Sequence, residues 1–249
     1  MSYTKFTKLH QQSNLLILGN VWDAHSAKIA ASAGFQALGT SSHAIANSLG
    51  YADGEQIPVN ELLFVVERIV KSVKIPVSVD FESGYSDNPF EVAKYVTQLS
   101  EMGVVGINLE DGKVVKSGRK LGKTGILTEK IEAIKSSTKN IFINARIDTF
   151  TTKHENALEE TIKRAKIYEE AGADGLFVPL AESKTDIEKI VNSTRLPLNL
   201  FLTDKLAKPA VLAELGVKRL SHGAKIYEYL VAQNTKLFHD FLANPKLPK

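Results

Sequence analysis

Short apolar runs alternate with longer amphipathic segments along most of this chain of 249 residues. Eight of these runs have the length and the flanking residues of buried strands. We predict strands at residues 15–23, 36–41, 75–80, 106–111, 141–148, 175–180, 197–202 and 219–224. The segments between them have helical spacing, and residues 89–103 show it clearly, with Pro89 at the start and Gly103 at the end. Residues 157–175 and a shorter segment from Lys208 repeat this pattern.

Apolar strands that alternate with helices are typical of a parallel sheet covered by helices. Eight such units in 249 residues predict an α/β fold of the closed (β/α)8 TIM barrel type, with residues 1–249 as a single domain. An open, doubly wound sheet is the alternative, but no strand is followed by a Gly-x-Gly-x-x-Gly motif that would support it.

Composition narrows the class of protein. The 31 basic residues alternate with 28 acidic ones and the net charge is +3, so a nucleic-acid partner is not indicated. The chain has no cysteine, which excludes disulfides, thiolate metal sites and cysteine nucleophiles. No apolar run approaches the roughly 20 residues that cross a bilayer, and the N-terminus lacks the apolar segment of a secretion signal. We therefore expect a soluble cytoplasmic protein without a membrane partner.

Charged side chains gather where the predicted strands end, which in such barrels is the end that carries the active site. They are Asp80 and Glu82 after the third strand, Glu110 and Asp111 after the fourth, and Arg146 and Asp148 after the fifth. Side chains two residues apart on an extended chain point the same way, so Asp80 with Glu82, and Arg146 with Asp148, can each point at one place.

Carboxylates that converge in a partly buried site repel one another unless a cation lies between them. Oxygen ligands and the absence of cysteine favour Mg²⁺, or alternatively Mn²⁺, over zinc, and Asp80 is the best candidate for a direct ligand. The alternative is structural: acids at strand ends often cap helices, as we expect for Asp87, and Arg146 could be an ion-pair partner of Asp148.

Two loops complete the candidate site. Backbone N–H groups near Ser41 and Ser42 could hold a carboxylate, although a serine-rich turn is the simpler interpretation. Single His43, His222 and Trp22 residues are more often structural than catalytic. Residues 112–125 contain four glycines and five basic residues and are a candidate mobile lid.

The whole set of motifs resembles the isocitrate lyase and phosphoenolpyruvate mutase superfamily, within it the phosphoenolpyruvate mutase-like, carboxyvinyl-carboxyphosphonate phosphorylmutase-type branch. The matching segments, in order, are NVWDAHSAKIAASAGFQALGTSS, SLGYADG, VDFESGY, GVVGINLED, INARIDTF, AGADGLFVP and LAELGVKRLS. The resemblance implies a barrel that assembles as a homotetramer, a dimer of dimers, with the C-terminal helix exchanged between subunits. It also implies chemistry on α-keto or 2-hydroxy acids through a Mg²⁺-stabilised enolate.

Carried over residue by residue, the resemblance places the metal-site acids at Asp80, Glu82 and Glu110, with Asp53 nearby. It places the carboxylate-binding backbone at Ser41 and Ser42. The arginine that holds the keto or enolate oxygen falls on Arg146. These assignments are what the resemblance implies for the site.

Departures from the family pattern narrow the range of activities that we expect. Isocitrate and methylisocitrate lyases carry a catalytic cysteine in the lid; this chain has none, so we expect neither of these two activities. Most relatives have aspartate where Glu82 stands. The mutases have a tryptophan on strand two, where this chain has Gly39, and a histidine on strand six, where it has Pro179. They also have an asparagine in the lid, and the lid of this chain contains none.

We therefore expect a Mg²⁺-dependent lyase or hydrolase that cleaves a C–C bond of a small α-keto or 2-hydroxy (di)carboxylic acid. Lys120 or Lys123 of the lid, or a water molecule on the metal, would supply the proton or the nucleophile. One alternative is C–P chemistry on phosphonopyruvate, as a mutase or a hydrolase. Another is a barrel that binds a keto acid without turning it over.

Overall fold

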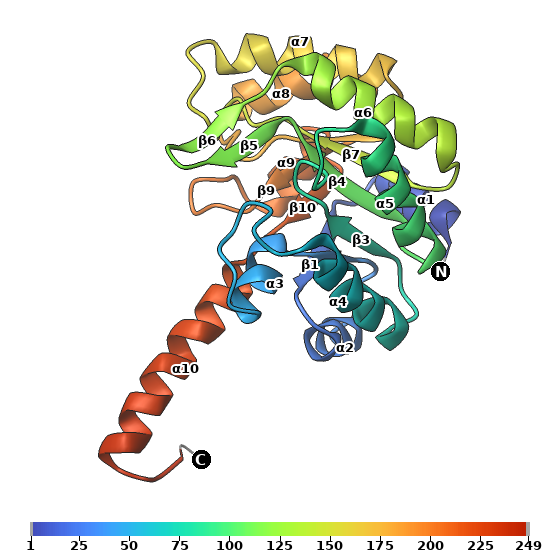
Figure 1. Cartoon of the computed structure of the whole chain (residues 1–249). Coiled ribbons are helices and arrows are strands. Elements are labelled where there is room, and N and C mark those ends of the chain that lie inside the picture. Colours follow the sequence, from blue (N-terminus) through green and yellow to red (C-terminus); the bar gives the residue numbers. More distant parts are fainter. Residues whose placement is uncertain (1, 248–249) are drawn as a thin grey trace.

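The computed structural model describes residues 2–247 and contains a closed barrel of eight parallel strands (Figure 1). Around the barrel the strands follow the order β1-β10-β9-β8-β7-β4-β3-β2. The strands are β1 (Leu16–Val21), β2 (Leu38–Thr40), β3 (Val77–Asp80), β4 (Gly106–Glu110), β7 (Phe142–Arg146), β8 (Gly175–Phe177), β9 (Leu198–Phe201) and β10 (Arg219–Ser221). Each lies within one of the eight predicted segments, so the predicted (β/α)8 barrel is confirmed and the open sheet is excluded.

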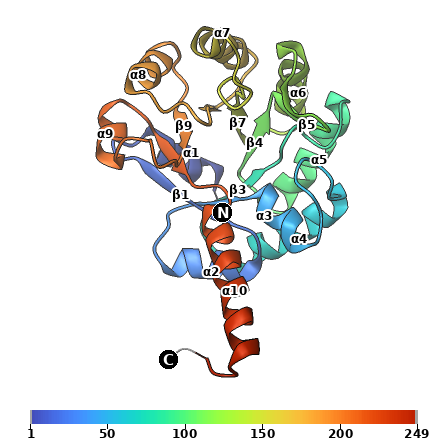
Figure 2. The same cartoon turned by 90° about the vertical axis from the view of Figure 1, so that its left-hand side faces the viewer.

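Helices surround the barrel and one of them leaves it (Figure 2). They are α1 (Tyr3–Gln11), α2 (Ala24–Ser32), α3 (Ser42–Ser48), α4 (Val59–Ser72), α5 (Pro89–Glu101), α6 (Thr124–Ser137), α7 (Ala157–Glu170), α8 (Lys184–Asn192), α9 (Pro209–Glu214) and α10 (Lys225–Ala243). Within residues 2–247, none of these helices has the length and apolar character that a membrane span requires. The predicted N-cap at Asp87 is wrong, because Asn88 accepts from Phe90 N–H and caps α5 while Asp87 pairs with Lys113.

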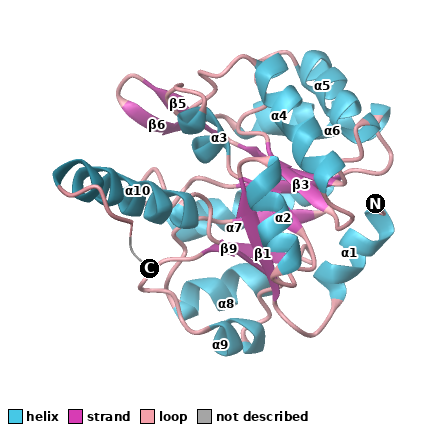
Figure 3. Cartoon of the chain, turned by 90° about the horizontal axis from the view of Figure 1, so that it is seen from below, coloured by secondary structure: helices cyan, strands magenta, loops and turns pink. Residues whose placement is uncertain are grey.

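The predicted lid contains regular structure that the sequence did not indicate. Strands β5 (Gly112–Val115) and β6 (Gly118–Leu121) form an antiparallel hairpin that stands beside the barrel (Figure 3). A two-residue connection joins them, and Gly118 has the positive φ of +107° that lets the chain turn back. Four-residue strands rich in glycine and lysine show too little alternation to be separated from a loop by pattern.

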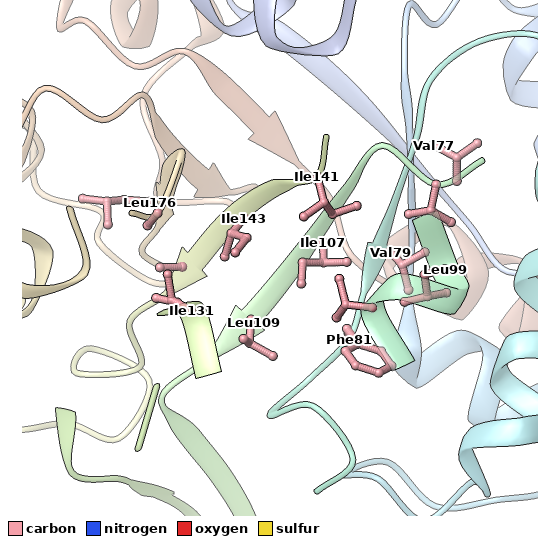
Figure 4. Packing of buried hydrophobic residues seen from close by; sticks show 14 of the residues in the cluster. Val77, Val79, Phe81, Leu99, Ile107, Leu109, Ile131, Ile141, Ile143 and Leu176 are labelled. Atoms are coloured by element: carbon pink, nitrogen blue, oxygen red, sulfur yellow. The ribbon is translucent and has the colours of Figure 1, made fainter. Parts of the chain in front are cut away.

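Alternation along the strands sorts apolar and polar side chains into two layers. On β3 and β4, Val77, Val79, Ile107 and Leu109 point outward and pack beneath the helices (Figure 4). Their neighbours on the same strands point into the barrel, and they include polar side chains in place of the bulky aliphatic residues that usually fill such barrels. The apolar layer therefore holds the fold, and the interior is left free for polar groups.

Helix α1 closes the end of the barrel opposite the predicted site. Phe6 packs edge-on against Phe142, and the ring of His10 stacks on Phe142 with the centroids 4.3 Å apart. One ring nitrogen of His10, Nδ1, donates to the Phe6 carbonyl at 2.9 Å. Burial and the nearby positive charge of Arg219 lower the pKa of His10 to about 3. His10 is therefore neutral in the folded protein and would be protonated in the unfolded chain near pH 5.

Replacing His10 with phenylalanine should make stability less sensitive to acid. Because its folded pKa lies below its unfolded value, His10 stabilises the fold fully above about pH 6.5, and this contribution is lost as pH falls toward the folded pKa. The free energy of unfolding of the parent should fall faster than that of H10F, by up to about 1.4 kcal/mol per pH unit. Denaturant titrations at pH 7, 6 and 5 measure this difference, and parallel curves would contradict it. The exposed His239, replaced in the same way, serves as the control.

Candidate active site

Three adjacent strands bring the predicted charged residues to the carboxyl end of the barrel. In the register of the sheet, Asp80 of β3 lies beside Asn108 of β4, and Glu110 of β4 lies beside Arg146 of β7. These side chains occupy inward-facing positions of their strands, since their apolar neighbours face the helices. The expectation that Asp80, Glu110 and Arg146 share one end of the barrel is met by the geometry.

Arg146 is partly buried and lies between two buried acids. Its Nη1 lies 2.9 Å from Glu110 Oε2, and its Nε donates to Asp148 Oδ1 at 2.8 Å. Although burial alone would lower the pKa of Arg146, Glu110 and Asp148 raise it above the usual value. Burial raises the pKa of Glu110, and the charges of Arg146 and Arg119 oppose this effect. The guanidinium is thus fixed in place and charged, and its Nη2 has no partner among the described residues.

A second arginine enters the site from the hairpin. Arg119 of β6 donates through Nη1 to Glu110 and, at 2.8 Å, to Asp148 Oδ2. Side chains alternate on a strand, so Arg119 and Leu121 face the protein while Lys120 is exposed. Sequence reasoning placed this basic residue in the lid but missed its role, because the two-residue period of β6 was not recognised.

Asp80 forms no ion pair with a described side chain, although its charge acts on Arg146 and Arg219 and raises the pKa of each. Its Oδ2 accepts from the Ser42 hydroxyl at 2.7 Å and from the Ser42 backbone N–H at 3.4 Å. Its Oδ1 faces the Asn108 amide at 3.5 Å, a long and therefore weak hydrogen bond. Neutral donors orient this carboxylate but do not neutralise it.

Glu82 follows in a tight turn and is buried. It has a positive φ of 46°, which costs a residue with a side chain on the order of 1 kcal/mol, and its carboxylate accepts from the Tyr85 hydroxyl at 2.9 Å. Burial, together with repulsion by Asp80 and Glu110, raises the pKa of Glu82 to about 8. Without a cation, Glu82 is therefore largely protonated near pH 7, and Asp80 and Glu82 are two close acids that have no ion-pair partner among the described residues.

Neighbouring segments hold this turn in its strained conformation. Glu55 accepts from the Ser83 hydroxyl and from the Tyr85 backbone N–H, both at 2.8 Å. From the other side, the buried Lys130 of α6 donates through Nζ to the Ser83 carbonyl at 2.7 Å. Burial lowers the pKa of Lys130. Glu82 is therefore positioned by contacts from two other parts of the chain.

The donor set fits a hard divalent cation that is held partly through water. Asp80 and Glu82 supply oxygen atoms and uncompensated charge, which Mg²⁺ prefers. Within residues 2–247, no three acidic or histidine side chains lie close enough to ligate one ion directly, and Glu110 is engaged by two arginines. Asp80 as the direct ligand, with Glu82 and Glu110 acting through water, is the arrangement that these contacts allow.

Both backbone N–H groups of the predicted carboxylate-binding turn have partners within the protein. The Ser41 backbone N–H donates to the Val21 carbonyl at 3.0 Å, and the Ser41 hydroxyl accepts from Ala44 N–H as the N-cap of α3. Ser42 faces Asp80 instead. Of the two residues, Ser42 is therefore the one whose polar groups reach the candidate site.

The remaining predicted site residues lie at its margin. Asp53 is exposed and close to His43, with Oδ2 3.8 Å from Nδ1, and its charge contributes to the raised pKa of Glu82. Lys120 and Lys123 are both exposed. Lys123 lines a cavity of about 100 Å³ that Glu110 also lines, whereas Lys120 is not among its lining residues.

Asp111, although adjacent to Glu110, is a structural residue. It accepts from Arg164 at 3.0 Å and from the Tyr168 hydroxyl at 2.9 Å on α7, and from Asp148 N–H at 2.9 Å. These contacts tie the end of β4 to α7, the helix that follows the next strand of the barrel, β7. The expected structural interpretation also fits His222, whose Nε2 accepts from Asn20 N–H at 3.0 Å.

Replacing Arg119 with glutamine should release the hairpin. The substitution removes the cation that links β6 to the buried Glu110 and Asp148, so we expect hydrogen exchange in residues 112–121 to become about tenfold faster. Lys120→Gln is the matched control, because that neighbouring side chain faces solvent and its removal should leave exchange unchanged. Equal exchange in parent and R119Q would show that other contacts hold the hairpin.

Comparison with known proteins identifies the family of this barrel. The family model described as phosphoenolpyruvate phosphomutase matches residues 6–242. The chain belongs to the phosphoenolpyruvate phosphomutase family. This places it in the superfamily of phosphoenolpyruvate mutase and isocitrate lyase, whose members include lyases, mutases and hydrolases that act on keto acids. The family resemblance stated from the motifs is thereby confirmed.

Several members of the family resemble this one closely. An uncharacterised protein of Mycobacterium tuberculosis is 37% identical over 89% of this chain and 83% of its own length. A solved structure from Burkholderia cenocepacia J2315, provisionally assigned as a phosphonomutase, is 37% identical, has a TM-score of 0.90 and covers 96% of this chain and 98% of that chain. A 2-methylisocitrate lyase of Halalkalibacterium halodurans is 28% identical over 84% of this chain and 70% of its own length.

Proposed function

We propose that this protein is a Mg²⁺-dependent lyase or hydrolase that cleaves a C–C bond of a small α-keto or 2-hydroxy (di)carboxylic acid. The observation that carries the proposal is the pairing, at one end of the barrel, of an unneutralised acid pair with a fixed arginine. Asp80 and Glu82 form the acid pair, and Arg146 is held between Glu110 and Asp148. The relationship to a C–C lyase, 2-methylisocitrate lyase, supports it.

Each of these groups has a part in forming an enolate. Breaking a bond beside a carbonyl group leaves negative charge on the carbonyl oxygen, and a donor fixed there in advance stabilises that charge. Arg146 can supply such a donor from Nη2, since its other contacts prevent it from turning away. Asp80, with Glu82 and Glu110 acting through water, would hold the cation, whose charge lowers the energy of the enolate.

The source of the proton is part of the proposal. Lys123 is the better placed of the two lid lysines, because it borders the same cavity as Glu110. Lys120 faces solvent and would reach the substrate only after the hairpin moves. Asp53, which lies close enough to Glu82 to affect its pKa, is the acid that could exchange a proton at the opposite margin of the site.

A substrate panel tests this function. Pyruvate and glyoxylate release from 2-hydroxy and 2-keto dicarboxylates would be measured with Mg²⁺ and again with excess EDTA. We expect turnover of at least one compound, lost on chelation and restored by added Mg²⁺. Turnover that is indifferent to EDTA would disprove the metal dependence. No release of pyruvate or glyoxylate would disprove the lyase reaction, and no consumption of any compound would disprove C–C cleavage altogether.

A second candidate is C–P chemistry on phosphonopyruvate, as a mutase or a hydrolase. It is favoured by the 37% identity to the protein assigned as a phosphonomutase. The phosphorus NMR spectrum of phosphonopyruvate incubated with the protein and Mg²⁺ distinguishes the two. New phosphoenolpyruvate or phosphate resonances would support this candidate, whereas an unchanged spectrum would exclude it.

Helix α10 supports a homo-oligomeric assembly in which this helix is exchanged between subunits. The helix leads away from the barrel, none of its residues is buried, and Tyr229, Phe238 and Leu242 are 65%, 77% and 85% exposed (Figure 2). Apolar surface of this extent marks an interaction site. Light scattering of F238E/L242E should show dissociation to monomers, with K236E as the control. A parent that is already monomeric would disprove the exchange.

A further inference from the structure

Arg219 spans the interior of the barrel beneath the candidate site. It lies on β10, is 1% exposed, and donates through Nη2 to Asn108 Oδ1 of β4 at 3.0 Å. Strands β10 and β4 are not neighbours, because β9, β8 and β7 separate them on one side and β1, β2 and β3 on the other. The guanidinium therefore reaches across the barrel to the opposite wall.

Glycines keep this passage open. A Cβ atom at Gly39 would lie 2.6 Å from Leu18 Cδ2, and one at Gly175 would lie 3.0 Å from Asn144 Oδ1. Side chains larger than hydrogen at these inward positions would displace the groups around Asn144 and Leu18. These two glycines therefore leave room for the side chains of Leu18, Phe142 and Asn144.

The buried charge of Arg219 is not explained by a contribution to stability. Arg219 makes no ion pair with a described carboxylate, and its Nε and Nη1 have no hydrogen-bond partner among the described residues. Burial lowers the pKa of Arg219 to about 9, opposed by the negative charge of Asp80. Removing a buried charge of this kind is often neutral or stabilising, so its presence calls for a role other than packing.

The contacts of Asn108 indicate that role. Its Oδ1 accepts from two donors, Arg219 Nη2 at 3.0 Å and Asn144 Nδ2 at 2.8 Å. Two donors on the oxygen fix the orientation of the amide, since the NH2 group must then point the other way. The amide nitrogen accordingly faces Asp80 Oδ1 at 3.5 Å, opposite the Ser42 hydroxyl on Oδ2.

We propose that Arg219 is a positioning residue that orients the Asp80 carboxylate toward its cation, acting across the barrel through the amide of Asn108. The inference rests on the proposed function in that it takes Asp80 as the ligand of a divalent cation. Outer partners of metal ligands typically contribute a factor of 10 to 100 in metal affinity. Arg219 belongs to this class, although it touches neither the substrate nor the cation.

A double-mutant cycle tests the proposal. Mg²⁺ binding to the full chain would be measured by calorimetry for the parent, R219M, N108L and R219M/N108L, with thermal unfolding as a second readout. We expect each single variant to bind Mg²⁺ about tenfold more weakly, and the double variant no more weakly than N108L. R219K, which keeps a donor on a chain of similar length, should bind within about threefold of the parent.

Asn199 provides the matched control. It is 1% exposed, lies beside Arg219 in the sheet register, and pairs with Ser221 rather than with the Asp80 contacts. N199A should lose stability but bind Mg²⁺ as the parent does. The proposal would be overturned if R219M bound Mg²⁺ within twofold of the parent or more tightly. Additive losses of Mg²⁺ affinity in the double variant would overturn it as well.

A crystal structure of R219M separates this inference from the proposed function. If Arg219 orients the carboxylate, Asp80 should turn away from Asn108 in the variant even without a metal. An unmoved Asp80 overturns the positioning role whatever the metal affinity. A parent that binds no Mg²⁺ would instead overturn the proposed cation site, while a moved Asp80 would still support the contact through Asn108. Should N108L fail to fold, N108A replaces it in the cycle.

Discussion

Replacement of Arg146 with methionine should both destabilise the protein and remove turnover. The substitution leaves Glu110 and Asp148, both buried, with Arg119 as their one remaining cation in the described residues. Breaking a buried ion pair from one side typically costs about 3–5 kcal/mol, and we expect a loss of that size in the free energy of unfolding. Loss of a fixed donor at a developing oxyanion should lower kcat by about 100- to 1000-fold.

Two further variants separate these effects. Arg195→Met removes an ion pair with Glu169 whose arginine is 94% exposed, and such surface pairs contribute at most about 1 kcal/mol. Adding D148N to R146M neutralises one of the carboxylates left behind, so part of the stability should return while turnover stays low. Equal unfolding free energies for R146M and the parent would contradict the buried network.

The barrel was predictable from the sequence because its strands and helices have different periods. Each strand that carries outward valine or isoleucine, such as Val79 and Ile107, must place its polar neighbours inward, and this also predicted where Asp80 and Glu110 lie. Hairpin β5–β6 was not predicted, because its strands are short and lack an apolar face. Contacts across the barrel, such as Arg219 to Asn108, depend on closure of the sheet and leave no local pattern.

The charge balance of the site is also different from the expectation. The convergent carboxylates predicted a metal ion between them, with an ion pair of Arg146 and Asp148 as the structural alternative. In the structure, Arg146 and Arg119 neutralise Glu110 and Asp148, and the unresolved repulsion is confined to Asp80 and Glu82. The uncompensated charge is thus smaller and better localised than the sequence indicated, and it identifies Asp80 as the position at which a substitution should matter most.

Replacement of Asp80 with alanine should abolish metal binding and turnover while leaving the fold intact. The side chain of Asp80 makes hydrogen bonds only to Ser42 and Asn108 among the described residues, so little stabilising contact is lost. Its charge repels Glu82, and removing that repulsion should leave the free energy of unfolding unchanged or slightly higher. Loss of a direct ligand should weaken Mg²⁺ binding at least about 100-fold and lower kcat by about 1000-fold.

Asp87 provides the matched control for this prediction. It lies in the same loop after β3, but its side chain is 79% exposed and pairs with Lys113 of the hairpin. D87A should therefore bind Mg²⁺ and turn over substrate as the parent does. Calorimetric titration with Mg²⁺ gives the metal affinity of both variants, and pyruvate release at saturating Mg²⁺ gives their turnover. If D80A retained the metal affinity of the parent, Glu82 and Glu110 would have to hold the cation without Asp80, and the longer side chain of Glu82 would then be the direct ligand.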